Sequence, residues 1–157
     1  MIYFIGAGPG AADLITVKGK ELLEKADLII YAGSLVNPEL LNYAKPECII
    51  MDSAKMTLEE VIAAMVPAAQ AGKLVVRLHT GDPCVYGAIR EQMDRLDKLG
   101  IEYDVCPGVS SFCGAAAALK AEYTLPDVSQ TVIITRMEGR TPVPVSYTHL
   151  RAHETDS

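Results

Sequence analysis

The chain has 157 residues, half of them apolar, which is the size of one domain with a core of its own. Its net charge of -6 argues against a surface devoted to nucleic acid or to anionic membrane lipids. The apolar runs are too short to cross a bilayer, and the first residues lack the charged segment and cleavage site of a secretory signal. We therefore expect a cytoplasmic protein with no nucleic-acid or membrane partner.

Short β-rich runs alternate along the chain with longer segments of helical periodicity. We expect strands at residues 2–5, 28–31, 48–51, 74–78, 103–106 and 131–135, and helices at residues 17–26, 38–44, 57–71, 87–99 and 112–120. This alternation predicts an α/β fold in which a largely parallel sheet is flanked by helices.

The predicted helix at residues 57–71 carries the clearest local signals. Thr57 and Glu60 have the spacing of a capping box, in which a threonine cap contributes about 1 kcal/mol. Pro67 should kink this helix or end it early, because proline has no backbone N–H to donate.

The end of the chain differs in character from the rest. Pro142 and Pro144 lie close together and mark residues 136–144 as an interdomain linker that follows an α/β domain at residues 1–135. Residues 145–157 offer no apolar period and resemble translated sequencing-adapter sequence, so we expect a non-native tail. His149 and His153 in this tail have the spacing of a zinc-binding helix but no third ligand, so no metal site is predicted.

The cysteines show neither a CxxC pair nor partner histidines at zinc spacing. We therefore expect small buried hydrophobic side chains rather than disulfides or metal ligands. The four positions are Cys48, Cys84, Cys106 and Cys113.

Three loops rich in glycine or proline each follow a predicted strand, at residues 6–10, 80–83 and 107–111. In a parallel sheet all three fall on the carboxyl edge, where the ligands of open α/β sheets bind. Glycine lets the backbone come close to a ligand, while Asp82, Ser110 and Ser111 supply hydrogen-bonding groups. One such loop alone would be an ordinary turn, but three on one edge favour a ligand site.

The loops lack residues that two common classes of ligand site require, which restricts the class of ligand. A phosphate-binding P-loop needs a lysine that does not follow Gly10. The run at residues 6–11 fits the loose dinucleotide pattern, but Pro9 removes a backbone donor and the strand before Gly33 ends without an acid for a ribose. A nicotinamide-dependent dehydrogenase is therefore a poor second interpretation.

Three segments resemble, in order and spacing, the signature segments of the tetrapyrrole (precorrin) methylase family: FIGAGPGAADLITVKG, VVRLHTGDPCVYGAI and PGVSSFCGAAAALKAEYTLPD. The resemblance covers the chain from Met1 to about Pro144. The phrases YAGSLVNPELL, HTGDPCVYGAIREQM and TRMEGRTPVP look most like the branch that methylates C11 of precorrin-4 or cobalt-precorrin-4 in cobalamin biosynthesis.

This resemblance implies an S-adenosylmethionine-dependent methyltransferase with two domains, of which this chain holds the N-terminal one, and a homodimer at full length. The donor would lie in the cleft between the domains, with the tetrapyrrole substrate in an adjoining trough. We therefore expect the chain alone to be inactive. By the family pattern, the donor contacts fall on Pro9, Thr80, Gly81, Asp82, Val85, Ser110 and Ser111.

The chemistry asks little of protein side chains, because an electron-rich carbon displaces the donor sulfur and positioning supplies most of the acceleration. No catalytic residue is assigned. His79 beside the donor loop is either a proton-accepting base or a structural histidine. Substrate carboxylates would favour basic side chains in the trough, although solvated surface charges are the alternative for each. The candidates by type are Lys18, Arg77, Arg90, Arg136 and Arg140.

Two alternatives to this function stay open. One is a uroporphyrinogen-III methyltransferase or another precorrin C-methyltransferase acting at a different carbon. The other is a non-catalytic fragment that binds a ligand without completing a reaction.

Overall fold

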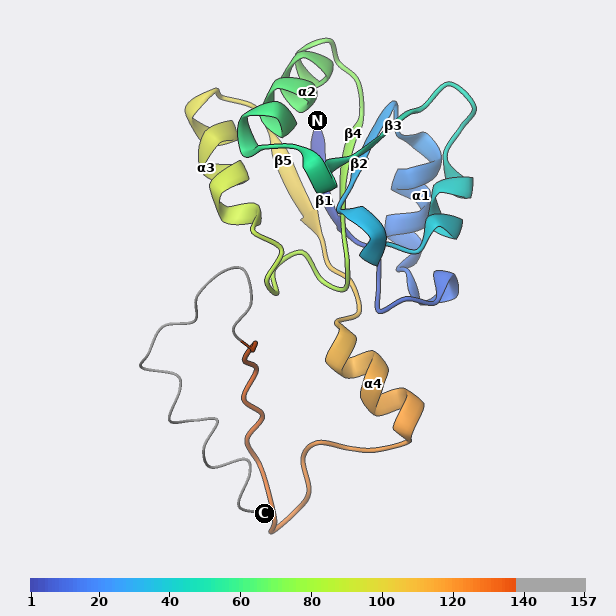
Figure 1. Ribbon diagram of the computed structural model, residues 1–157, viewed down its shortest axis with the longest axis vertical. Helices are drawn as coiled ribbons and strands as arrows, with labels where there is room; N and C mark the ends of the chain where they lie inside the picture. Colours follow the sequence, from blue (N-terminus) through green and yellow to red (C-terminus); the bar gives the residue numbers. More distant parts are fainter. Residues whose placement is uncertain (138–157) are drawn as a thin grey trace. The chain divides into compact units, whose positions relative to one another are not determined.

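The computed structural model describes residues 1–137 of the chain. Five parallel strands form one sheet in the order β3-β2-β4-β1-β5 (Figure 1). The strands are β1 (Ile2–Gly6), β2 (Leu28–Tyr31), β3 (Ile49–Asp52), β4 (Val75–His79) and β5 (Tyr103–Cys106). Each strand is parallel to its neighbours, so all the carboxyl ends share one edge. The predicted α/β fold with a parallel sheet is confirmed.

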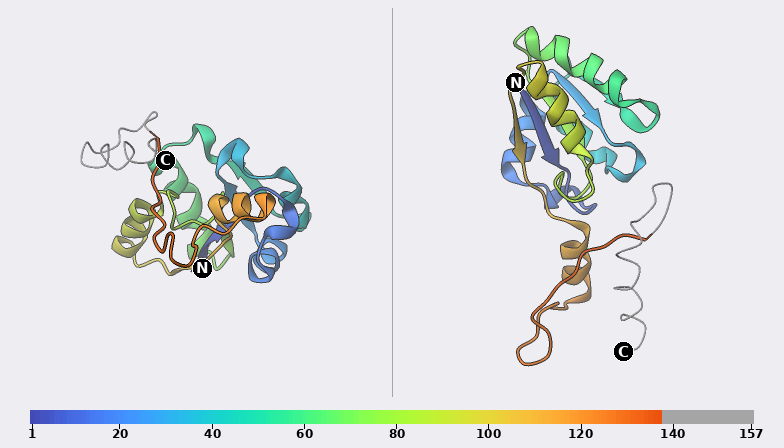
Figure 2. Two further views of the ribbon diagram at one scale, coloured as in Figure 1. Left: turned by 90° about the horizontal axis from the view of Figure 1, so that it is seen from below. Right: turned by 90° about the vertical axis from the view of Figure 1, so that its left-hand side faces the viewer.

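Helices cover both faces of this sheet (Figures 1 and 2). α1 (Val17–Lys25) covers one face, and α2 (Leu58–Gln70) and α3 (Ile89–Lys98) cover the other. α4 (Ser111–Leu119) follows β5 and covers neither face (Figure 1). Short 3-10 helices lie at Ala12–Leu14, Gly33–Leu35, Pro38–Tyr43 and Ser53–Lys55. Leu23 of α1 packs with sheet residues on one face, whereas Met65 of α2 and Leu96 of α3 pack on the other. Burying each such side chain contributes roughly 1.5–3 kcal/mol, so both layers are held by apolar contact.

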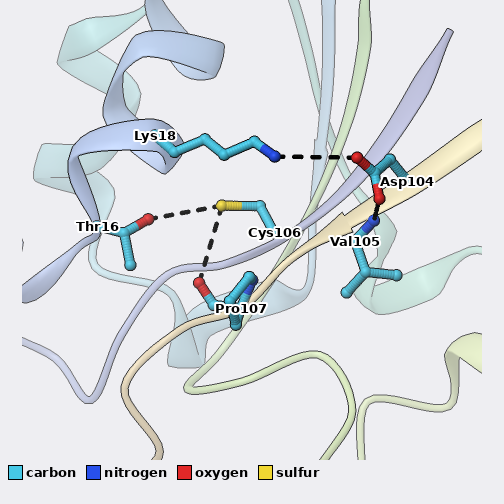
Figure 3. Close-up of polar contacts among 6 residues, drawn as sticks. All are labelled: Thr16, Lys18, Asp104, Val105, Cys106 and Pro107. Atoms are coloured by element: carbon cyan, nitrogen blue, oxygen red, sulfur yellow. Dashed lines mark hydrogen bonds and ion pairs between the residues drawn. The ribbon is translucent and has the colours of Figure 1, made fainter.

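The start of α1 is joined to β5 by polar contacts (Figure 3). Thr16 caps α1, because its Oγ1 accepts the backbone N–H of Gly19 at 3.0 Å, and the same oxygen lies 3.5 Å from Sγ of Cys106. Lys18 Nζ lies 3.8 Å from Asp104 Oδ2. The loop after β1 is therefore fixed beside the end of β5.

The capping box predicted for α2 is confirmed. Glu60 N donates to Thr57 Oγ1 at 3.2 Å, and Thr57 N donates to Glu60 Oε2 at 2.7 Å. Of the two effects predicted for Pro67, the early end is wrong, because α2 continues to Gln70, and the kink stays a prediction. Proline at position 67 removes only the one helical hydrogen bond that a backbone N–H there would donate. Its carbonyl still accepts from Ala71 N at 3.0 Å, and neighbouring apolar side chains pack against the core.

Residues 131–135 do not form the predicted strand. A strand needs a partner for its backbone groups, and no described strand pairs with this segment, which belongs to a second unit at Glu122–Ser157. The first unit is Met1–Ala121. The domain limits at residues 135 and 144 stay predictions. The proposed tail, with His149 and His153, and most of the proposed linker lie outside the described residues.

The cysteine prediction holds in part. Cys106 is buried and Cys48 is half-buried, but Cys84 and Cys113 are exposed, so the prediction is wrong for these two. Cys84 lies in the loop after β4, and Cys113 lies on α4, which buries none of its residues. Within residues 1–137, no helix is long and apolar enough to span a membrane.

Candidate functional site

A pocket of about 450 Å³ lies at the carboxyl edge of the sheet, where the loops after β1, β4 and β5 meet. Its lining consists of Gly8, Pro9, Leu35, Thr80, Gly81, Asp82, Val85, Tyr86, Ser110 and Ser111. All seven residues that the family pattern selected are in this set. The structure therefore brings them together, although their role as donor contacts stays a prediction.

Three lining residues are not among those seven: Gly8, Leu35 and Tyr86. Gly8 and Tyr86 are direct neighbours of selected residues, so the motif segments themselves could have indicated them. Leu35 comes from the loop after β2, and its signal was the phrase YAGSLVNPELL. The pocket thus draws on four strand ends rather than three.

Glycines allow the strand ends at the pocket to approach closely. A Cβ on Gly108 would lie 2.2 Å from Gly81 O, and one on Gly6 would lie 2.5 Å from Gly108 Cα. Gly8 and Gly81 pair through their backbones, with N···O distances of 3.2 Å and 2.9 Å in the two directions. Gly8 and Gly81 therefore line the pocket with backbone atoms, while Gly6 and Gly108 let the strand ends behind them pack closely.

Asp82 joins two of the pocket loops. Its Oδ1 accepts the backbone N–H of Cys84 at 2.8 Å within the loop after β4. Its Oδ2 accepts the N–H of Gly108 at 2.9 Å in the loop after β5. Hydrogen bonds to an ionised acceptor are stronger than neutral ones, so this carboxylate positions both loops. Burial and the Asp82 charge together raise the pKa of the Cys84 thiol.

The two pocket serines lie where α4 begins. Ser110 is the residue before α4 and its side chain makes no capping hydrogen bond, while its carbonyl accepts from Cys113 N at 3.0 Å. Gly114 of α4 faces Pro9, because a Cβ there would lie 2.6 Å from Pro9 Cβ. This close packing places the start of α4 against the loop after β1.

The loop between β4 and α3 has an unusual backbone. Tyr86 and Ala88 adopt left-handed conformations with φ of 57° and 52°, which is uncommon for residues other than glycine. Gly87 between them is close to Pro83, since a Cβ at Gly87 would lie 2.1 Å from Pro83 O. Such a conformation persists only where neighbouring groups hold it.

His79 is buried rather than part of the pocket lining. The residue is 4% exposed, and its Nε2 has no hydrogen-bond partner among the described residues. Burial, together with the nearby charge of Arg77, lowers the pKa of His79 to about 3. A neutral, enclosed imidazole of this kind favours the structural interpretation over the role of base.

The basic candidates for substrate carboxylates do not gather at the pocket. Arg77 is 6% exposed and its Nη1 donates to Ile30 O at 3.1 Å, so it is a core residue. Neither predicted role, a contact to substrate carboxylates or a solvated surface charge, fits this position. Burial lowers the pKa of Arg77 to about 10. Lys18 of α1 pairs with Asp104 of β5, and Arg90 pairs with Asp94 within α3. Arg136 lies in the second unit, and Arg140 lies outside the described residues.

Comparison with known proteins agrees with this geometry. The family model for tetrapyrrole (corrin/porphyrin) methylases matches residues 1–153. The chain belongs to the tetrapyrrole methylase family. The family resemblance found in the three sequence segments is thereby confirmed.

Similar proteins in this family are methyltransferases. Cobalt-precorrin-4 C(11)-methyltransferase of Methanocaldococcus jannaschii is 62% identical over 143 residues, which cover 91% of this chain and 55% of the relative. The protein of the same name from Priestia megaterium is 54% identical, with the same coverage of 91% and 55%. The chain thus spans about half the length of the curated relatives it matches.

Solved structures that resemble this chain are also tetrapyrrole methyltransferases. The X-ray structure of the cobalt precorrin-4 methyltransferase CbiF matches with a TM-score of 0.88 at 53% identity, over 92% of this chain and 60% of that one. Uroporphyrin-III C-methyltransferase of Thermus thermophilus, in complex with S-adenosylhomocysteine, matches with a TM-score of 0.67 at 30% identity. That match covers 83% of this chain and 52% of the other.

Proposed function

We propose that the pocket binds S-adenosylmethionine and that the chain forms the donor-binding part of a methyltransferase. Its acceptor would be C11 of precorrin-4 or cobalt-precorrin-4, in cobalamin biosynthesis. The observation that carries this proposal is the convergence of all seven selected residues, from loops far apart in sequence, on one pocket. The names of two relatives that are 62% and 54% identical to this chain support the choice of reaction.

The pocket residues fit the chemical character of the donor, which combines an aromatic base, a ribose and a charged amino acid. Pro9, Leu35 and Val85 offer apolar surface for the base. Thr80 and Ser110 offer hydroxyl groups for the polar parts. A pocket of about 450 Å³ also falls within the usual range for small-molecule sites, roughly 300–1,000 Å³.

These residues would hold the methyl donor and orient it toward the acceptor carbon. The bound sulfonium supplies an activated methyl group to an electron-rich carbon. Gly8 and Gly81 let backbone atoms contact the ligand directly, and the Asp82 hydrogen bonds keep the loops after β4 and β5 at a fixed spacing. In the longer protein, the apolar lining residues would help to exclude water from the donor, and positioning supplies much of the rate acceleration in reactions of this kind.

The sequence identities to named relatives favour C11 methylation over the reaction of uroporphyrinogen-III enzymes. Uroporphyrinogen-III C-methyltransferase of Bacillus subtilis is 43% identical over 127 residues, compared with 62% for the C(11) enzyme of M. jannaschii. A ligand-binding chain without catalytic activity is the second candidate, because the chain covers only 55% of that relative.

Titration of the chain with S-adenosylhomocysteine in a calorimeter tests the donor site. Val85→Arg should abolish binding, because a long charged side chain would fill the apolar part of the pocket. Val17→Arg is the matched control, since Val17 is 74% exposed on α1 and outside the pocket lining. Binding that survives Val85→Arg, or that is absent in the unchanged chain, would contradict the proposed site.

A chimera tests the reaction itself. Residues 1–143 would be joined to the part of the M. jannaschii relative that this chain does not cover. The chimera and the unchanged chain would each be incubated with labelled donor and either precorrin-4 or its cobalt complex. We expect label at C11 with the chimera and no turnover with the chain alone, because half the donor's surroundings would be missing. Label at another carbon would refute the assignment to C11.

We also propose that the longer protein is a cytoplasmic homodimer without nucleic-acid or membrane partners. The net charge of -6 on this chain supports the absence of nucleic-acid and membrane partners, because a negatively charged protein is repelled by DNA and by anionic lipid. Light scattering of the chimera should give twice the monomer mass. Sedimentation with DNA or with anionic vesicles should leave it in the supernatant.

A further inference from the structure

Gln92 connects the buried core to the pocket loop that precedes α3. Its side chain is 5% exposed on the sheet-facing side of α3. Its Oε1 accepts from Arg77 Nε at 3.2 Å, and its Nε2 donates to the carbonyl of Ala88 at 3.3 Å. Because the guanidinium can only donate, it fixes which end of the Gln92 amide faces Ala88.

Arg77 is itself held firmly enough to orient Gln92. It lies on β4 with 6% exposure, and its Nη1 donates to Ile30 O on β2 at 3.1 Å. A buried guanidinium is costly to leave without partners, so it keeps both contacts. A chain of hydrogen bonds therefore runs from β2 through Arg77 and Gln92 to Ala88.

The far end of these hydrogen bonds is the strained loop between β4 and α3, which carries Val85 and Tyr86 of the pocket lining. Ala88 and Tyr86 both adopt left-handed conformations, and Tyr86 lines the pocket together with Val85. Asp82 holds the first part of the loop through Cys84 N. The hydrogen bond from Gln92 holds the last part at Ala88, so the loop is fixed at both ends.

We propose that Gln92, oriented by Arg77, is a positioning residue that keeps Val85 and Tyr86 in the conformation that forms the pocket, and thereby sets the affinity for the donor. The identity of the ligand rests on the proposed function. The effect on the loop follows from the hydrogen bonds alone and can be measured without any ligand.

Gln92→Glu separates the two contacts of this side chain. A glutamate can still accept from Arg77 Nε, but it cannot donate to Ala88 O and places a negatively charged oxygen against that carbonyl. Gln92→Asn is a second variant without added charge, too short to reach both partners. Met93→Ala is the matched control, because Met93 is the next residue on α3 and packs against the same core.

Two measurements are made on the full 157-residue chain and each variant: amide hydrogen exchange across residues 83–89, and the affinity for S-adenosylhomocysteine by calorimetry. We expect both Gln92 variants to speed exchange in this loop and to weaken binding roughly tenfold, the effect of losing one buried hydrogen bond. Met93→Ala should lower the melting temperature without changing either quantity. A structural role alone would lower stability in all three variants and leave the loop exchange unchanged.

The possible failures are distinguishable. If the unchanged chain does not bind S-adenosylhomocysteine, the proposed function fails, while the exchange data still decide the role of Gln92. If loop exchange and affinity in both Gln92 variants equal those of the unchanged chain, the positioning role is refuted. Should the glutamate variant not fold, the asparagine variant gives the decision.

Discussion

Replacing His79 with leucine should change how the stability of this protein depends on pH. His79 is 4% exposed and its pKa is lowered to about 3 from the ordinary value of 6.5, mainly by burial and also by the charge of Arg77. The folded state therefore disfavours the protonated imidazole. In the unfolded chain the same side chain takes up a proton near its ordinary pKa.

The magnitude follows from the linkage between protonation and folding. Above pH 6.5 the imidazole is neutral in both states and contributes no pH dependence. Between pH 6.5 and about 3 the unfolded state binds more protons, so the free energy of unfolding falls as the pH falls. The slope is about 1.4 kcal/mol per pH unit, and the total loss by pH 3 is on the order of 5 kcal/mol.

Urea denaturation at pH values from 4.5 to 7.5 provides the assay. His79→Leu should flatten the curve below pH 6.5, with the difference from the unchanged chain reaching about 2 kcal/mol near pH 5. At pH 7 the variant should be about as stable or more stable, because it removes a buried Nε2 that has no partner among residues 1–137. Leucine also fills a similar volume with apolar atoms.

Phe4→Leu is the control for this experiment, because the ring of Phe4 lies 6.2 Å from that of His79 and does not titrate. It should lower stability equally at every pH. Parallel curves for His79→Leu and the unchanged chain would refute the reasoning, because they would mean that His79 is protonated as easily in the folded state as in the unfolded one.

Three further changes are tested by urea denaturation. Asp82→Ala should cost about 1–3 kcal/mol and weaken S-adenosylhomocysteine binding, because Gly108 N loses its acceptor; unchanged affinity and stability would contradict this. Gly108→Ala should cost more than Gly100→Ala, because its Cβ would lie 2.2 Å from Gly81 O, whereas Gly100→Ala meets nothing within 4 Å and costs only the strain of a φ of 64°; a loss at Gly108 no larger than that at Gly100 would show that the loops move apart easily. Thr57→Ala should cost about 1 kcal/mol, and no loss would mean that the cap is redundant.

The sequence by itself determined the five strands of the sheet, the helix order and the family, because these depend on local patterns. Apolar runs such as residues 28–31 must be buried on both faces, and Thr57 and Glu60 make a cap whatever lies elsewhere. The same logic placed three loops on one sheet edge, since the carboxyl ends of parallel strands always coincide. The family pattern then selected seven residues, all of which line the pocket.

Tertiary structure alone decided what each polar side chain does. The sequence could not show that Arg77 is enclosed beneath α3, because an arginine in a strand has the same local pattern whether a helix covers it or not. Nor could it show that both oxygens of Asp82 accept backbone N–H groups, one of them 26 residues away. The failed strand at residues 131–135 has the same cause, because β-rich composition permits a strand but only a neighbouring strand can pair with it.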